Sequence, residues 1–119
     1  MRIRLADMAH ARSGDKADRA DIGLFAWDAD GYAVLKREVT ADRVATHFAW
    51  IAQGPVERYP LDNILAIKFV LNRALQGGAA RSLRSDNLGK TVGAALLRME
   101  IDVSEAEAAR IVRREPRTK

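Results

Sequence analysis

Apolar and polar residues follow one another along this chain in patterns that predict several strands. Residues 2–9 alternate charged and apolar positions, which is the period of a half-buried strand, and residues 20–26 form a second segment of strand length. Residues 64–71 are the most apolar run. Their length and β-branched content favour a central strand, although Leu65, Phe69 and Asn72 would also fit a helix. Residues 56–61 predict an edge strand, because Pro60 lacks the N–H that an interior strand needs.

Two segments in the first half of the chain predict helices. A turn signal ends at Gly31, so residues 32–39 can be the return strand of a hairpin or a short helix, and we favour the helix. Thr40 is a suitable N-cap for a clearer helix over residues 40–53, whose apolar side chains fall on one face. The Gly54-Pro pair that follows is a typical helix stop.

The last third of the chain predicts two further helices around a short strand. Residues 90–98 carry apolar side chains at helical spacing, and residues 99–103 have the composition of a closing strand. Ser104 followed by Glu107 is a capping-box pattern, which predicts the start of a terminal helix over residues 104–114.

A dense polar segment, residues 8–18, follows the first predicted strand. It combines an imidazole, two cations, a hydroxyl and two carboxylates, which is the inventory of a proton-transfer or anion-binding site. We expect a loop with Ser13-Gly14-Asp15 as its turn, because glycine reaches positive φ and the flanking side chains bond nearby amides. On residue types alone, a solvated structural loop is the commoner explanation of such a cluster. Its position between two strands places it at one edge of the predicted sheet.

Composition restricts the chemistry further. The chain has 119 residues, 48% of them hydrophobic, which suits one compact domain. It has no cysteine and only two histidines, His10 and His47, so the sequence indicates no disulfide, thiolate chemistry, metal or cofactor. The charged N-terminus does not resemble a signal peptide, and no run has the length of a membrane span. We expect a soluble, cytoplasmic protein.

The formal net charge of +4 invites a nucleic-acid interpretation, but the charge distribution weakens it. Much of the excess lies in the last residues of the chain, and the rest is near neutral. The sequence shows neither zinc-finger spacing nor the interleaved aromatic and basic residues of single-strand binders. Nucleic-acid binding therefore ranks last among the hypotheses.

Six short motifs follow one another in order along the chain: His10-Ala-Arg-Ser-Gly-Asp-Lys-Ala-Asp18, Asp21-Ile-Gly, Gly54-Pro-Val-Glu-Arg-Tyr59, Phe69-Val-Leu-Asn72, Arg81-Ser-Leu-Arg84 and Gly89-Lys-Thr. Together they resemble the C-terminal domain of the acyclic terpene utilisation protein A (AtuA) family, which also occurs as separate small proteins. The resemblance covers roughly residues 2–103, and several motifs in order make it more specific than any single one.

The resemblance implies an α+β, ferredoxin-like two-layer sandwich, with a mostly antiparallel sheet and helices on one face. It also implies a setting in the bacterial breakdown of branched or terpenoid acids through CoA thioesters, without an assigned reaction or catalytic residue. We therefore expect an AtuA-like ferredoxin-fold domain over residues 1–103, followed by a C-terminal helix and basic tail over residues 104–119.

The leading hypothesis from the residues and the resemblance is a binding domain or accessory subunit for an anionic metabolite, either an acyl-CoA or a carboxylic acid. Its cations would pair with carboxylate or phosphate and its neutral side chains would add hydrogen bonds. If a reaction occurs, His10 and Asp15 form the acid/base pair, since a carboxylate can orient an imidazole. The predicted ligand-binding residues are Arg12, Ser13, Lys16, Asn72, Arg81 and Arg84.

The competing hypothesis is structural. In that case the polar segment is a network that holds strand ends together, and the open sheet face or an edge strand forms a homodimer or docks on a larger AtuA-type partner subunit. In larger members of the family this domain follows a large N-terminal domain, which favours docking. Convergence of the polar residues on a pocket would favour ligand binding instead.

Overall fold

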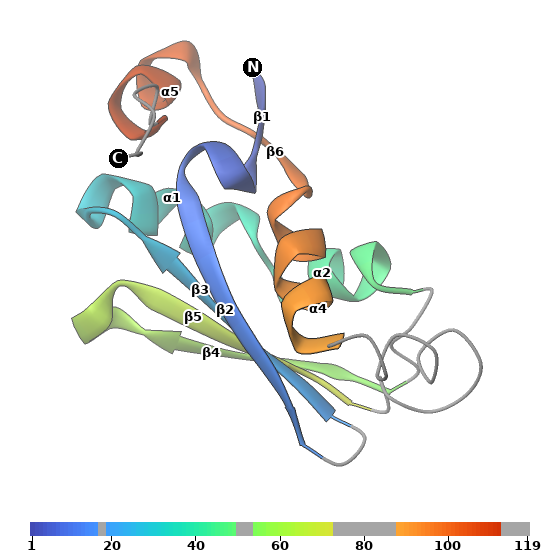
Figure 1. The fold of residues 1–119 in the computed structure, drawn as a ribbon. Coiled ribbons are helices and arrows are strands. Elements are labelled where there is room, and N and C mark those ends of the chain that lie inside the picture. Colours follow the sequence, from blue (N-terminus) through green and yellow to red (C-terminus); the bar gives the residue numbers. More distant parts are fainter. Residues whose placement is uncertain (17–18, 50–53, 73–87, 113–119) are drawn as a thin grey trace.

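A sheet and the helices packed on it form the two layers of the molecule. The computed structural model describes residues 1–16, 19–49, 54–72 and 88–112 (Figure 1). The main sheet has the strand order β2-β3-β5-β4, and every neighbouring pair in it is antiparallel. Its strands are β2 (Ala9–Lys16), β3 (Arg19–Ala26), β4 (Val56–Leu61) and β5 (Ala66–Leu71).

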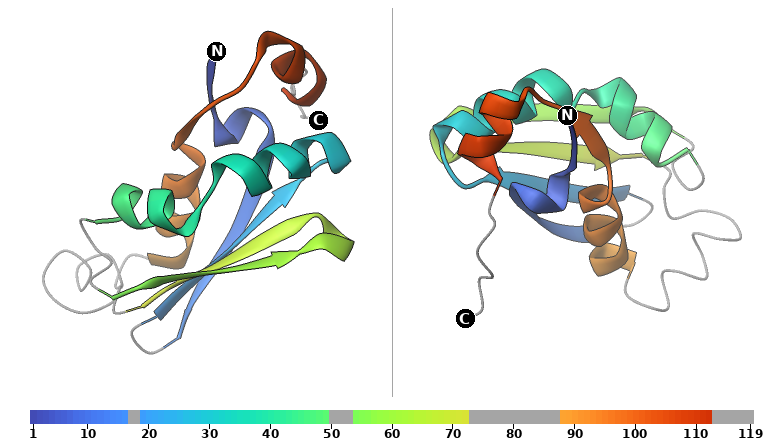
Figure 2. Two further views of the ribbon diagram at one scale, coloured as in Figure 1. Left: turned by 180° about the vertical axis from the view of Figure 1, so that it is seen from behind. Right: turned by 90° about the horizontal axis from the view of Figure 1, so that it is seen from above.

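Helices cover one face of this sheet. They are α1 (Ala29–Glu38), α2 (Ala41–His47) and α4 (Leu88–Leu97). Figure 2 shows them on the same side, and no helix in the described part of the chain covers the opposite face. The α+β two-layer sandwich predicted from the sequence is therefore confirmed. In chain order the main sheet consists of two hairpins with helices between and after them, rather than the usual βαββαβ succession.

Alternation along β3 and β5 separates a buried face of the main sheet from an open one. Ile22 and Leu24 of β3 are fully buried, whereas Asp21 and Phe25 are only partly buried. Successive side chains of a strand point to opposite faces, so the buried set faces the helices. The helices bury their own apolar side chains against the same face, including Leu35, Val44, Phe48 and Leu96.

The central and edge strands agree with the sequence-based expectations. The predicted strand over residues 20–26 is β3, and the predicted central strand is β5, an interior strand of the sheet. Before β5 a short 3-10 turn, Asp62–Ile64, leads to Leu65 in the left-handed region at φ 56°. Strand β4 lies at the edge of the sheet, as the proline in it predicted.

Side-chain caps explain where the first two helices begin. Asp28 accepts a hydrogen bond from the Gly31 N–H at 2.9 Å, so α1 is a helix and not a hairpin strand. Thr40 Oγ1 accepts from the Arg43 N–H at 3.2 Å, which confirms the predicted cap of α2. Helix α2 ends at His47, earlier than predicted, and residues 50–53 lie outside the described residues.

The main correction concerns the polar segment. Residues 9–16 are not a loop but strand β2, which pairs with β3 along its whole length. The predicted turn at Ser13-Gly14-Asp15 is wrong, because all three residues lie within this pairing. The segment does lie at an edge of the sheet, since β2 is the outermost strand on that side.

The N-terminus pairs outside the main sheet. Strand β1 (Arg2–Arg4) is antiparallel to β6 (Glu100–Asp102), and the two form a separate small sheet. The strand predicted over residues 2–9 is therefore wrong beyond Arg4, because a 3-10 turn at Leu5–Asp7 redirects the chain into β2. The closing strand expected after α4 exists as β6, but it closes the small sheet.

The last described helix, α5 (Glu105–Ile111), begins with the predicted capping box of Ser104 and Glu107. Arg37 of α1 binds both carboxylate oxygens of Glu107, at 2.7 and 3.1 Å. These hydrogen bonds lower the pKa of Glu107 to about 2. Because Ala108 also joins the hydrophobic core, α5 packs against α1 instead of projecting into solvent.

Candidate functional site

The open face of the main sheet carries three rows of residues that run across the strands. Strand register defines an aromatic row of His10, Phe25, Ala66 and Leu61, a cationic row of Arg12, Gly23, Lys68 and Tyr59, and an acidic row of Gly14, Asp21, Val70 and Glu57. Rows two residues apart are separated by about 7 Å along the strands. Apolar, positive and negative groups thus lie next to one another on the open face.

A cavity of about 260 Å³ lies on this face. Gly23 contributes no side chain to the cationic row, so space remains between Arg12 on β2 and Lys68 on β5. Phe25 lines the cavity from the aromatic row and Asp21 from the acidic row. Lys68 Nζ lies 3.9 Å from Asp21 Oδ2, a loose ion pair, so two cations and one carboxylate leave the cavity positive.

The cavity depends on a glycine at position 23. A Cβ built there would lie 2.9 Å from Cε1 and 3.3 Å from Cζ of the Phe25 ring. Such distances are shorter than ordinary van der Waals contact, so any other residue would displace the ring. Gly23 therefore allows the Phe25 ring to lie close to the strand and keeps the space beside it free.

Arg12 and Ser13, predicted together as ligand residues, lie on opposite faces of β2. Arg12 is exposed on the open face, and among the residues that the structure describes no carboxylate lies within 4 Å of its guanidinium. Ser13 faces helix α4, where its Oγ accepts a hydrogen bond from the Gly93 N–H at 3.1 Å. Consecutive strand residues necessarily diverge in this way. Arg12 is thus available to a ligand in the open-face cavity. Ser13 also lines this cavity, but its hydroxyl fastens α4 to the sheet, so its role in ligand binding stays a prediction.

Asn72 is engaged at the end of β5. Its Nδ2 donates to the Pro55 carbonyl at 2.9 Å and to Glu57 Oε2 at 2.8 Å. The Tyr59 hydroxyl donates to the other Glu57 oxygen, and the hydrogen bonds from Tyr59 and Asn72 lower the pKa of Glu57. The Asn72 amide therefore joins β5 to the edge strand, and its role in ligand binding stays a prediction.

His10 lies on the open face in a group of aromatic rings. Its imidazole stacks on Phe25 with centroids 5.1 Å apart, and the Trp27 ring lies 4.4 Å away on a tilt of 33°. His10 and Asp15 are five residues apart on one extended strand, which separates their backbones by roughly 17 Å. This arrangement gives no support to a direct acid/base pair, so catalysis by these residues stays a prediction.

The structure does not describe the side chains of the remaining predicted site residues. Arg81 and Arg84 lie outside the described residues. For Lys16, as for Asp15, the structure describes the backbone within β2 but not the side chain. Their predicted pairing with a ligand anion stays a prediction.

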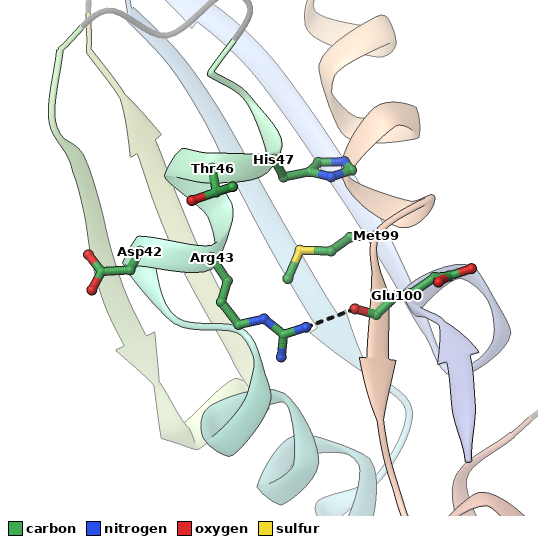
Figure 3. A pocket seen from close by; sticks show the side chains of 6 residues that line it. All are labelled: Asp42, Arg43, Thr46, His47, Met99 and Glu100. Carbon is green, nitrogen blue, oxygen red and sulfur yellow. Dashed lines mark hydrogen bonds between the residues drawn. The ribbon is translucent and has the colours of Figure 1, made fainter.

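A second hollow, of about 400 Å³, lies between α2 and the start of β6 (Figure 3). Arg43 is the cation that lines this hollow, and its guanidinium is already bound to Glu38 at 3.0 Å and to the Glu100 carbonyl at 3.0 Å. His47 Nε2 lies 2.8 Å from the Ala95 carbonyl oxygen, so this histidine joins α2 to α4. Carboxylates line the hollow and its cation is engaged, so it is poorly suited to an anion.

A third hollow, of about 500 Å³, follows the junction of β2 and α4. Most of its lining side chains are small or apolar, and its single charged group is Arg12 at the rim. The open-face cavity is therefore the better candidate for an anionic ligand, because it offers a second cation, Lys68, on the opposite side.

Sequence reasoning missed Lys68 and Phe25. Lys68 is the only charged residue in the apolar run over residues 64–71, and a period of two places it opposite the buried side chains. That alternation was a usable signal for an open-face cation. Phe25 gave no comparable signal, because an aromatic residue in an apolar strand is usually part of the core.

Neither a metal-binding cluster nor a membrane-spanning helix occurs in the described part of the chain. No group of three or more His, Cys, Asp or Glu side chains is arranged to hold a metal ion there. Within the same residues, no helix combines the length and the apolar character needed to cross a membrane.

Comparison with known proteins adds one finding. Residues 3–102 match the model of a family described as the AtuA ferredoxin-like domain. The match confirms the resemblance predicted from the six ordered motifs, and it agrees with the ferredoxin-like two-layer architecture. No curated protein and no solved structure matches the chain.

Proposed function

We propose that this chain, which belongs to the AtuA ferredoxin-like domain family, is a binding domain for an anionic metabolite, an acyl-CoA or a carboxylic acid. The observation that carries the proposal is the open-face cavity between Arg12 and Lys68. Its setting would be the bacterial catabolism of branched or terpenoid acids, with the domain acting as an accessory subunit in the cytoplasm. The proposal assigns no reaction to the domain.

The cavity suits the junction of an anionic group and an apolar chain. Arg12 and Lys68 approach it from either side, and a guanidinium and an ammonium both bind carboxylate or phosphate oxygens. Phe25, Leu61 and Ala66 supply an apolar wall for a chain attached to that anion. At about 260 Å³ the cavity is smaller than typical sites for drug-sized ligands, so it would hold part of an acyl-CoA.

The test is calorimetric titration with butyrate, a branched-chain carboxylate and the matching acyl-CoA. Arg12→Gln and Lys68→Gln should each weaken binding about tenfold or more, since hydrogen bonds to charged groups contribute about 1.5–3 kcal/mol. Arg98→Gln is the matched control, because it removes the same charge from an exposed position at the end of the helix layer. Lys68 lines only the open-face cavity of the three hollows, so its variant separates this site from the α4 junction.

Unliganded stability distinguishes binding from structure. Arg12 and Lys68 are both exposed, so their variants should melt within a few degrees of the parent protein. Loss of binding with unchanged melting supports the proposal. A binding isotherm identical in parent protein and both variants would refute it, as would no binding of any member of the panel at millimolar concentration.

A second candidate is an oligomerisation or docking module, either a homodimer or a subunit of a larger AtuA-type partner. The observation in its favour is a group of exposed apolar side chains near one end of the main sheet: Trp27, Tyr59, Leu61 and Ile64, which are 38–52% exposed. Exposed apolar groups that lie together mark interaction surfaces. Light scattering at micromolar concentration would show about twice the chain mass of 13.2 kDa for a homodimer. A monomeric mass would exclude the homodimer.

A further inference from the structure

The aromatic rings on the open face form a stack that begins at the cavity and ends in solvent. Phe25, which lines the cavity, stacks on His10 with an interplanar angle of 15°. The Trp27 ring follows on His10 at 4.4 Å between centroids. Trp27 is 39% exposed, so a large aromatic surface at the outer end of the stack stays in water.

Positive charge lies next to this stack. Arg12 is two residues from His10 on β2, about 7 Å along the strand, and Lys68 lies in the same row as Arg12. A nucleotide has a planar base joined to its phosphates by a ribose. Trp27 is two residues beyond Phe25, the neighbour of His10, so it lies about 14 Å along the strands from the row of Arg12 and Lys68. A ribose and diphosphate, together with the long Arg12 and Lys68 side chains, can cover this distance. Proteins that bind single-stranded nucleic acids on an open sheet combine aromatic rings for the bases with cations for the phosphates, and the same chemistry suits a single nucleotide.

We infer that the ligand of the open face is a nucleotide-bearing anion, whose base stacks on Trp27 and whose phosphates lie at Arg12 and Lys68. The inference rests on the proposed function and narrows it, because an acyl-CoA carries an adenine nucleotide and a free carboxylic acid does not. It also accounts for the small cavity: only the part of the ligand beside Gly23 has to enter it.

Intrinsic fluorescence gives a direct test. The chain has two tryptophans, Trp27 and Trp50, so a Trp50→Phe variant reports on Trp27 alone. Coenzyme A is the probe that contains a base, and 4′-phosphopantetheine is the probe that lacks the base together with the ribose and its 3′-phosphate. The change of this preference in Trp27 variants separates base stacking from the additional phosphate contacts. Coenzyme A should quench Trp27 emission and bind about tenfold or more tightly than phosphopantetheine, the range expected for stacking of one base. Phosphopantetheine should leave the emission unchanged.

Substitution of Trp27 identifies the stacking surface. Trp27→Leu should remove most of the preference for coenzyme A over phosphopantetheine, whereas Trp27→Phe, which keeps a ring, should retain much of it. Binding of both probes to Trp27→Leu should still be weakened by Arg12→Gln. A purely structural role of Trp27 would lower the melting temperature without changing the ratio of the two affinities.

Each contrary outcome has a distinct meaning. Equal affinity for the two probes, without quenching, overturns the nucleotide inference and leaves the anion-binding proposal standing. Failure of coenzyme A, phosphopantetheine and the carboxylate panel to bind overturns both. Tight, steeply salt-dependent binding of a single-stranded oligonucleotide, with no response to coenzyme A, also overturns the inference, because the rings would then serve a nucleic acid.

Discussion

Because β2 and α4 lie close together, substitution of Gly93 should change the free energy of unfolding in an unusual way. In an ordinary helix interior, Gly→Ala raises the free energy of unfolding by about 1 kcal/mol. Here a Cβ on Gly93 would lie 2.7 Å from Ser13 Oγ, the atom that accepts the Gly93 hydrogen bond. The substitution therefore removes a hydrogen bond, which costs about 1 kcal/mol, and forces strand and helix apart, which costs about 1–3 kcal/mol.

The sum of these effects predicts both the sign and the size of the change in the free energy of unfolding. Gly93→Ala should lower the free energy of unfolding by about 1–3 kcal/mol in the parent protein. In a Ser13→Ala background the clashing oxygen is absent, and the nearest remaining atoms are the Cβ atoms of residues 13 and 11, at 3.5 and 3.9 Å. These are ordinary contacts. In that background the same substitution should instead raise the free energy of unfolding by about 1 kcal/mol.

Urea denaturation of the parent protein, the two single variants and the double variant measures the coupling. The effect of Gly93→Ala should differ by about 2–4 kcal/mol between the two backgrounds. Gly14→Ala is a control for strand β2, since nothing lies within 4 Å of a Cβ built there. If Gly93→Ala stabilised the protein equally in both backgrounds, Ser13 would not face α4 and the assignment of β2 would be wrong.

Three further predictions concern other contacts. Arg43→Leu should lower the free energy of unfolding by about 1.5–3 kcal/mol in urea denaturation, because the guanidinium joins α2 to Glu38 and β6. The pKa of Glu107 is lowered to about 2, so its contribution to stability is complete above pH 4.5 and is lost as the pH falls toward 2. In acid denaturation, the stability of Glu107→Gln should therefore depend less on pH in this window than that of the parent protein. Burial and, after it, the hydrogen bond to Asp62 raise the pKa of Tyr32 to about 12. In a spectrophotometric titration, the Tyr32→Phe variant should therefore lack the tyrosine ionisation that occurs at the highest pH in the parent protein.

Local signals in the sequence predicted much of the fold. The apolar alternation of β3 and the apolar run of β5 are strong because both strands are interior and bury one face against the helices. Helices α1, α2 and α5 begin at side-chain caps, and a cap is encoded within a few residues. These elements needed no information from distant parts of the chain.

Strand β2 was not predicted because the helix that explains its residues lies far away in the sequence. Ala9, Ala11 and Ser13 are small because α4 packs on them, and Gly93, which permits that close approach, is 80 residues further along the chain than Ser13. Without α4, a segment with small residues on one face and polar residues on the other resembles a turn. The alternation of small and large side chains was present in the sequence, but a polar edge strand gives a weak version of it.

The candidate site was predictable only in part. Arg12 was identified from its residue type, whereas Lys68 became a candidate once strand register placed it in the same row. Register between β2, β3 and β5 depends on turns and packing, which single positions do not encode. The same limitation explains why Ser13, next to Arg12 in the sequence, was grouped with it although the two side chains point to opposite faces of the sheet.

An amide chemical-shift titration of the isotopically labelled protein with an acyl-CoA tests ligand binding at the open face most directly. The largest shifts should occur at Arg12, Gly23, Phe25 and Lys68, which line the open-face cavity, and at Trp27 beside it. Helix α2, which lines the second hollow on the covered side of the sheet, should remain unchanged. Shifts confined to α2 and β6, or no shifts at millimolar ligand, would show that the open face does not bind this ligand.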